Sequence, residues 1–169
     1  TWGILGGLPS IAQGAILNPN QAGEEFLGTI FSNVALKKGD SFTRPSAGGG
    51  GLGDPLERDV NAVLEDVIDE YVSLERAKLD YGVVIREIDR DIDAFEIDMA
   101  ATVKERAYIR KNRQQWLETD PYEVERLYNT GEINQMDVVR RYGVIMDYKA
   151  NQVLPISTKQ YRTSMKKRS

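Results

Sequence analysis

Glycine is concentrated at one end of this chain, and that concentration limits what the first third can fold into. Most of the 15 glycines precede Asp54, whereas charged and helix-favouring residues dominate after a change in composition across residues 46–58. Glycine loses more backbone freedom on folding than any other residue, so it weakens helices and strands. We therefore expect an α+β chain: residues 1–55 as a Gly-rich strand and loop piece that completes a larger domain, and residues 56–169 as a mainly helical C-terminal region.

The Gly-rich piece contains two strand-like stretches, residues 30–36 and 41–44, on either side of the turn sequence Lys37-Lys38-Gly39-Asp40. Residues 1–24 contain too many glycines and prolines for a helix, so we expect tight turns there. Two strands alone are only marginally stable in water. Their partners should therefore lie outside these residues, and we interpret the chain, which starts at Thr1, as a fragment or processed piece of a longer one.

Apolar residues recur at helical spacing after Asp59, which is a plausible N-cap. Ser73 can cap a second, shorter helix, and Tyr81-Gly82-Val83 then leaves that helix for a β-branched stretch. The same order of caps, apolar positions and Tyr-Gly-Val recurs further along the chain, with an asparagine in the place of Ser73. We therefore expect two related helix-turn-helix-strand units, at about residues 59–86 and 120–147, and chance similarity between short amphipathic helices is the alternative.

Between the two units, Asp98 can cap a long helix that runs from about residue 99 to 117. The helix has one narrow apolar stripe, formed by Met99, Val103 and Ala107. This stripe fits either a partner surface or a solvated helix stabilised by ion pairs.

The end of the chain shows no clear periodicity. Residues 147–158 contain a proline and predict a loop with a short strand near Val153. The basic residues that follow are typical of a solvated tail; they are Lys159, Arg162, Lys166, Lys167 and Arg168.

The most unusual motif is a run of four glycines: Gly48, Gly49, Gly50 and Gly51. Such a run fits a backbone that needs positive φ or that another group approaches closely. It can form a loop whose amides line an active site or an anion site, which makes these four glycines the candidate site residues, or a sharp connector between domains. It is not a nucleotide-binding P-loop, because the Lys-Ser/Thr pair that closes the phosphate cradle is missing.

Composition excludes several classes of function. The formal net charge is −4 and the basic residues are spread among acids, so the chain lacks the positive surface that nucleic-acid binding needs. It contains no cysteine, which excludes disulfides and fits a reducing, cytoplasmic compartment, and no histidine, the commonest acid-base group and transition-metal ligand. No apolar run reaches the roughly 20 residues of a membrane span, and the first residues lack the basic start of a signal peptide. We therefore expect no metal site, no nucleic-acid partner and no membrane partner.

Several motifs in the first half together resemble the C-terminal signature of hydantoinase B-type subunits. They cover about residues 3–86 and comprise Gly6-Gly7-Leu8-Pro9-Ser10, Lys38-Gly39-Asp40, the run GGGGLGDPLER from Gly48 to Arg58, Asp59, Val63, Asp66-Val67, Val72-Ser73 and Tyr81-Gly82-Val83-Val84. The second half, with Trp116-Leu117-Glu118-Thr119-Asp120-Pro121 and its own Tyr-Gly-Val, looks like the extended ending of the acetone and acetophenone carboxylase branch.

The resemblance implies a segment of the large subunit of a multisubunit, ATP-dependent enzyme. In this family an actin-like, hydantoinase A-type ATPase subunit phosphorylates the substrate, and the hydantoinase B-type subunit completes the reaction. The carboxylase branch joins a ketone enolate to carbon dioxide, and the hydantoinase and oxoprolinase branch hydrolyses a cyclic amide. ATP with magnesium, and manganese in acetone carboxylases, are the cofactors of such complexes, and none is expected to be bound by this chain alone.

The resemblance carries over no catalytic residue, so the chain is expected to contribute fold completion and a subunit interface. Three functions remain open at this point. The first is support within a ketone carboxylase, the second is membership in a cyclic amide hydrolase, and the third is a non-catalytic helical interaction module. Fold-level likeness indicates a class of chemistry and not a substrate.

Overall fold

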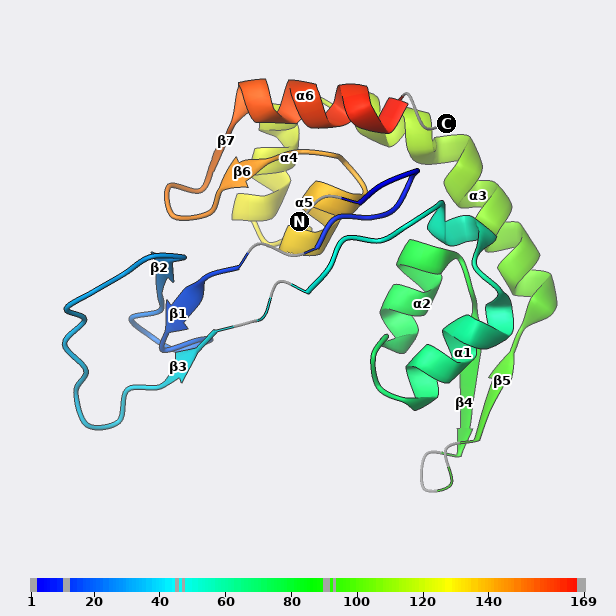
Figure 1. Ribbon diagram of the computed structural model, residues 1–169, viewed down its shortest axis with the longest axis horizontal. Helices are drawn as coiled ribbons and strands as arrows, with labels where there is room; N and C mark the ends of the chain where they lie inside the picture. Colours follow the sequence, from blue (N-terminus) through cyan, green and yellow to red (C-terminus); the bar gives the residue numbers. More distant parts are fainter. Residues whose placement is uncertain are drawn as a thin grey trace.

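The computed structural model describes residues 3–10, 13–44, 46, 48–89, 92 and 94–166. Three short strands form a lobe at one side, and two helical units lie beside each other at the other side, with the long helix α3 running along their outer edge (Figure 1). The elements are, in chain order, β1 (Ala15–Leu17), β2 (Glu25–Gly28), β3 (Phe42–Thr43), the 3-10 helix η1 (Pro55–Glu57), α1 (Val60–Ile68), α2 (Leu74–Tyr81), β4 (Ile85–Asp89), β5 (Ala94–Ile97), α3 (Met99–Glu118), α4 (Pro121–Asn129), α5 (Gln135–Arg140), β6 (Met146–Asp147), β7 (Gln152–Val153) and α6 (Pro155–Lys166).

This arrangement confirms the α+β fold class, with a strand and loop piece first and a mainly helical region after it. The proposed domain boundary near residue 55 stays a prediction. No helix in the described part of the chain is both long and apolar enough to cross a membrane.

The strand lobe is an antiparallel sheet with the order β2-β1-β3. The predicted strand at 41–44 is confirmed as β3, and the turn before it closes through a hydrogen bond from the amide of Asp40 to the carbonyl of Lys37. The predicted strand at 30–36 is wrong, because these residues form an irregular loop. The strand that pairs with β1 on this side is β2 instead. Neither strand was predicted, since residues 1–24, which contain β1, were expected to form tight turns.

Asparagine chemistry explains this pairing. Asn18 and Asn20 adopt positive φ in the turn between β1 and β2, a conformation that asparagine tolerates better than most residues. The Asn18 side chain also accepts a hydrogen bond from the amide of Ser41 and donates one to Asp40. The side chain of Asn18 therefore links the turn between β1 and β2 to the residues that precede β3.

The first helical unit contains α1, α2 and the β4–β5 hairpin. Asp59 caps α1, Ser73 caps α2, and Gly82 ends α2 in the left-handed conformation, as the sequence predicts. The core of the unit consists of Val63, Val67, Ala77 and Val83.

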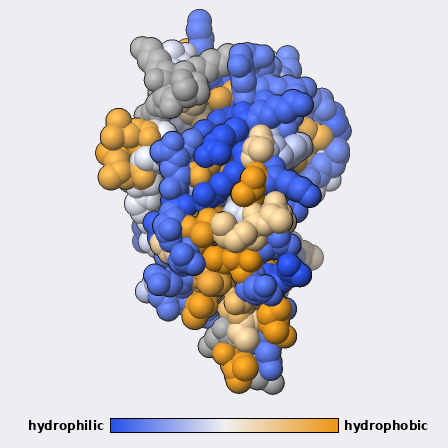
Figure 2. Space-filling model, turned by 90° about the vertical axis from the view of Figure 1, so that its right-hand side faces the viewer, coloured by the Kyte–Doolittle hydropathy of each residue, from blue (hydrophilic) through white to orange (hydrophobic). Residues whose placement is uncertain are grey.

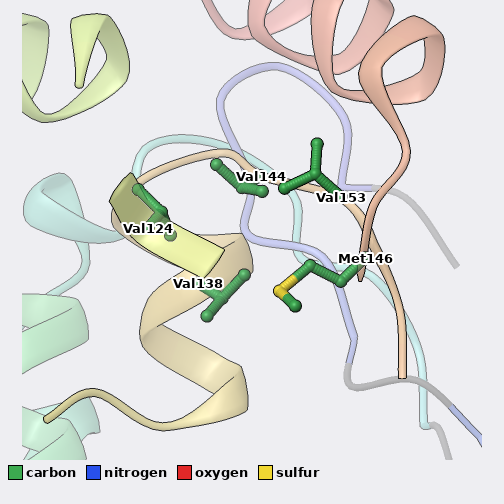
Figure 3. Packing of buried hydrophobic residues seen from close by; sticks show 5 residues of the cluster. All are labelled: Val124, Val138, Val144, Met146 and Val153. Carbon is green, nitrogen blue, oxygen red and sulfur yellow. The ribbon is translucent and has the colours of Figure 1, made fainter. Parts of the chain in front are cut away.

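The second unit repeats this order with α4, α5 and the β6–β7 hairpin. Asp120 caps α4, Asn134 caps α5, and Gly143 takes positive φ like Gly82. Its core consists of Val124, Val138, Val144, Met146 and Val153, which converge between α4, α5 and the hairpin (Figure 3). The two units are therefore related in structure, and the short strand predicted near Val153 is β7.

The repeat also includes a third helix in each unit, α3 in the first and α6 in the second. Thr102 in α3 accepts a hydrogen bond from the amide of Val84, and Thr158 in α6 accepts one from the amide of Ile145, both at 3.0 Å. Each threonine is 2% exposed.

In each unit an arginine on the third helix also binds the segment that follows the second helix. Arg106 Nε donates to the carbonyl of Tyr81 at 3.1 Å, and Arg162 Nε donates to that of Tyr142 at 3.0 Å. Each of these arginines lies against the glycine of the Tyr-Gly-Val sequence that follows the second helix of its unit.

The prediction for the end of the chain is wrong in part. Residues 155–158 were expected in a loop but form the first turn of α6. Lys159, Arg162 and Lys166 were expected in a solvated tail but also belong to α6, where Lys159 is exposed and Arg162 is half-buried. Pro155 occupies the first helical position, where proline favours a helix because the missing N–H has no partner there anyway. Lys167 and Arg168 lie outside the described residues.

The long helix α3 is confirmed, with Asp98 as its cap. Its predicted apolar stripe, Met99, Val103 and Ala107, is exposed, and the helix packs instead through Thr102, Ile109 and Leu117. On the side of the molecule shown in Figure 2, which is the right-hand side of Figure 1, apolar residues gather over the lower half. The exposure leaves both interpretations of the stripe open.

Candidate functional site

A cavity of about 520 Å³ lies between the two helical units. Its walls come from α2, α3, α6, the end of α5 and the Gly-rich segment. The cavity is lined by Gly6, Gly7, Leu8, Asp54, Pro55, Arg76, Leu79, Asp80, Ile109, Arg110, Arg113, Gln114, Trp116, Leu117, Asp137, Arg140, Arg141 and Met165. Its volume is typical of sites for small molecules.

The glycine run supports one wall of this cavity. The amide of Ile4 donates to the carbonyl of Gly51 at 2.9 Å, and the amide of Gly51 donates to the carbonyl of Leu8 at 2.9 Å. A Cβ atom on Gly7 would overlap the carbonyl group of Gly51, so only glycine permits this approach. The close pairing holds residues 6–8 against the cavity.

None of the candidate site residues Gly48, Gly49, Gly50 and Gly51 lines the cavity itself. The amide of Gly51 is used inside the chain, Gly48 has positive φ, and nothing lies within 4 Å of the place where Gly49 would carry a Cβ. A role of this loop as a donor to a ligand stays a prediction.

A network of four charged side chains joins α2 to α5 at the cavity. Arg76 Nη2 and Nε donate to Asp80 at 2.9 and 3.2 Å, and Arg76 Nη1 donates to Asp137 at 3.3 Å. Arg140 Nη1 also donates to Asp80, and Arg140 Nε donates to the carbonyl of Pro9 at 3.3 Å. Buried charges are tolerated only when paired and hydrogen-bonded, so this network fixes how the two units meet.

A second ion pair ties the Gly-rich segment to α3. Arg113 binds Asp54 in a bidentate manner, with N···O distances of 2.8 and 2.9 Å. Partial burial by itself raises the pKa of Asp54, but the hydrogen bonds from Arg113 and from the amide of Leu56, together with the charges of Arg113 and Arg110, outweigh it. The pKa of Asp54 is therefore below its ordinary value, and the carboxylate is charged at neutral pH.

Two further arginines at the cavity have no carboxylate partner among the described residues. Arg110 Nη2 makes one long contact, 3.4 Å, to the carbonyl of Leu56. Arg141 lies over the ring of Trp116, 4.9 Å from its centre.

The sequence alone does not indicate these cavity residues, because α2, α3 and α5 each contribute some of them and no local motif unites them. The only local signal is the spacing of Arg76 and Asp80, which lets them pair on one helix face.

The described residues do not fit a manganese centre. The chain has no histidine, and no group of three or more histidine, cysteine, aspartate or glutamate side chains among the described residues could hold a metal ion. The carboxylates at the cavity are instead bound to arginines.

The fold has a counterpart in a multisubunit enzyme. The nucleotide-free structure of acetone carboxylase, solved in a study of ATP-dependent acetone carboxylation, matches 75% of this chain and 22% of its own chain, with a TM-score of 0.53 and 23% sequence identity. At this identity the likeness shows the fold alone. No family profile matches the chain.

Curated relatives confirm the resemblance to hydantoinase B-type subunits. The chain is 40% identical over 75 residues to the alpha subunit of the acetone carboxylase of Xanthobacter autotrophicus and 38% identical over 72 residues to the beta subunit of the caprolactamase of Pseudomonas jessenii. It is 30% identical over 102 residues to a candidate B-type subunit of a D-/L-hydantoinase from a Pseudomonas strain.

These alignments cover 44%, 43% and 60% of this chain but only 9%, 12% and 16% of the respective relatives. The partial coverage is consistent with a C-terminal piece of such a protein.

Proposed function

We propose that this chain is a segment of the large subunit of an ATP-dependent ketone carboxylase of the acetone carboxylase kind, where it completes the fold and supplies part of a subunit interface. The similarity to the acetone carboxylase alpha subunit and the shared fold support this assignment. The observation that carries the role is the exposed apolar surface of the strand lobe.

That lobe has too little material of its own to cover its apolar residues. Ile30 is 94% exposed, and Phe31, Leu36 and Phe42 are also exposed. Phe31 and Phe42 pack against each other, with ring centres 5.9 Å apart. Clustered exposed apolar residues mark interaction sites in soluble proteins.

The sheet edges support the same role. In the described residues β2 and β3 pair only with β1, so each has an outer edge without a strand partner. Such edges accept a further strand from another segment. We therefore expect the lobe to dock onto the rest of the large subunit or a sister chain.

Substitution of the two aromatic residues tests this role. Phe31→Ser combined with Phe42→Ser should weaken co-purification with the companion chains, because the variant removes the apolar contact surface. Tyr71→Ser is the matched control, since Tyr71 is 81% exposed but belongs to the first helical unit. Equal recovery of companion chains by the aromatic variant and the control contradicts the docking role.

A cyclic amide hydrolase is the second candidate. The caprolactamase and hydantoinase relatives favour it, and the longest of the three reported alignments is with the hydantoinase relative. The substrate decides between the two functions. Bicarbonate-dependent ATP consumption with acetone supports the carboxylase, whereas ATP-dependent ring opening of hydantoin or caprolactam without bicarbonate supports the hydrolase.

The expected partners and cofactors belong to the whole complex. We propose a hydantoinase A-type, actin-like ATPase as the sister subunit, with ATP and magnesium bound there, manganese bound outside this segment, and the assembly in the cytoplasm. A stand-alone helical interaction module is the remaining alternative. It predicts a monomer of these 169 residues that unfolds cooperatively without companion chains and supports neither reaction.

A further inference from the structure

We propose that the cavity between the two helical units binds a small organic dianion, with a phosphate monoester as the ligand class. The site does not depend on which reaction the complete enzyme performs. Its basis is an excess of positive charge in a partly apolar cavity whose walls are held by ion pairs.

The charge balance indicates the charge of the ligand. Five arginines and three aspartates line the cavity. All three aspartates are bound by arginines: Asp54 by Arg113, Asp137 by Arg76, and Asp80 by Arg76 and Arg140. Two positive charges therefore remain without a carboxylate partner among the described residues, and a dianion matches them.

The remaining charges belong to Arg110 and Arg141. A guanidinium has five N–H donors in a planar fork that fits carboxylate and phosphate oxygens. Arg110 uses one donor in its long contact with Leu56, and Arg141 is positioned by stacking on Trp116. Most of their donors are therefore available to a ligand.

A neighbouring arginine adds to the positive field. Arg106 donates to two backbone carbonyls, those of Tyr81 and Arg58. Burial and then the charge of Arg110 lower the pKa of Arg106 below its ordinary value. An anion beside Arg110 relieves this repulsion between arginines.

The apolar part of the wall indicates that the ligand is more than an inorganic ion. Leu79, Ile109, Trp116, Leu117 and Met165 line the same cavity as the arginines. Small-molecule sites commonly combine an apolar lining with a few placed polar groups. A ligand with a small apolar body and a doubly charged head satisfies both parts of this cavity.

Calorimetric titration of the full chain, with companion chains where it is purified with them, tests the site. The probes are phenyl phosphate, phthalate, inorganic phosphate and neutral phenol. Phenyl phosphate should bind saturably and more tightly than inorganic phosphate, and phenol should not bind. Phthalate tests whether a dicarboxylate serves as well, and tighter binding of phthalate than of phenyl phosphate overturns the phosphate assignment.

Variants locate the binding. Arg110→Gln and Arg141→Gln should each weaken phenyl phosphate binding by about tenfold, because each removes a charge-assisted hydrogen bond. Arg126→Gln is the matched control, since Arg126 lies on α4, does not line the cavity and pairs with Glu123 and Glu132. Circular dichroism checks that each variant is folded, and Arg110→Lys, which keeps the charge, should retain more affinity than Arg110→Gln. No saturable binding, or equal affinity in the cavity variants and the control, overturns the proposal.

Discussion

Replacing Arg76 by methionine tests whether the charged network holds the two helical units together. Arg76 donates hydrogen bonds to Asp80 on its own helix and to Asp137 on α5. The side chains of Arg76, Asp80 and Asp137 are only 11%, 5% and 13% exposed. Methionine keeps much of the length of the side chain but removes its charge and all of these donors.

The expected loss of stability depends on which carboxylates the substitution leaves without a partner. Breaking a buried ion pair by removing one partner costs about 3–5 kcal/mol. Asp80 keeps its contact with Arg140, whereas Asp137 loses its bond to Arg76, so we expect the lower end of this range. For a chain of this size, ~3 kcal/mol lowers Tm by roughly 6–12 °C.

Thermal unfolding monitored by circular dichroism measures the loss, and hydrogen–deuterium exchange locates it. Exchange should rise in α2 and α5 before the cores of the units open. The control is Arg126→Met, which removes a guanidinium from an exposed ion pair and should leave Tm unchanged. If Arg76→Met lowers Tm no more than the control does, the reasoning about the network is refuted.

Three further predictions concern the segments around the cavity. Gly7→Ala should lower Tm markedly, because its Cβ would meet backbone atoms that cannot move aside, whereas Gly49→Ala, with open space around it, should be tolerated. Because the folded pKa of Asp54 is below its ordinary value, its ion pair stabilises the chain above pH ~4, the ordinary pKa range of aspartate, and this contribution is lost as the pH falls through the folded pKa. Urea unfolding should therefore show that the stability difference between wild type and Asp54→Asn shrinks in acid, and a constant difference contradicts this. Thr102→Val and Thr158→Val should each cost about 1–3 kcal/mol by leaving a part-buried amide without its acceptor. Thermal unfolding measures both losses, and clearly unequal values argue against equivalent contacts of the third helix in the two units.

Helix starts were predictable because their cause is local. Asp59, Ser73, Asp98, Asp120 and Asn134 each accept hydrogen bonds from amides two or three residues further on. Such a bond depends on a few neighbouring residues, so the sequence alone indicates it.

Strand pairing and the last helix were not predictable in this way. Residues 30–36 have the composition of a strand but no partner in the described chain, so composition alone misplaced them. Helix α6 begins at Pro155, a residue that in the sequence indicates a loop, and it is held by long-range contacts, including that of Thr158 with Ile145. A window of neighbouring residues contains no information about such contacts.

The cavity was hidden for the same reason. Arg76, Arg110 and Arg141 belong to three different elements, and only the meeting of the two units places them around one space. The sequence identified the units but not how they face each other. The glycine run was recognised as unusual, whereas its contact with residues 4–8 required the folded backbone.

The two units meet through equivalent positions that carry opposite charges. Arg76 and Asp137 each follow the cap of the second helix by three residues, and each donates its amide N–H to that cap, Ser73 or Asn134. If both copies carried the same residue there, two like charges would face each other in a buried place, which proteins tolerate poorly. The related units therefore cannot carry the same charge at this position, and the ion pair between Arg76 and Asp137 is the form in which they pack.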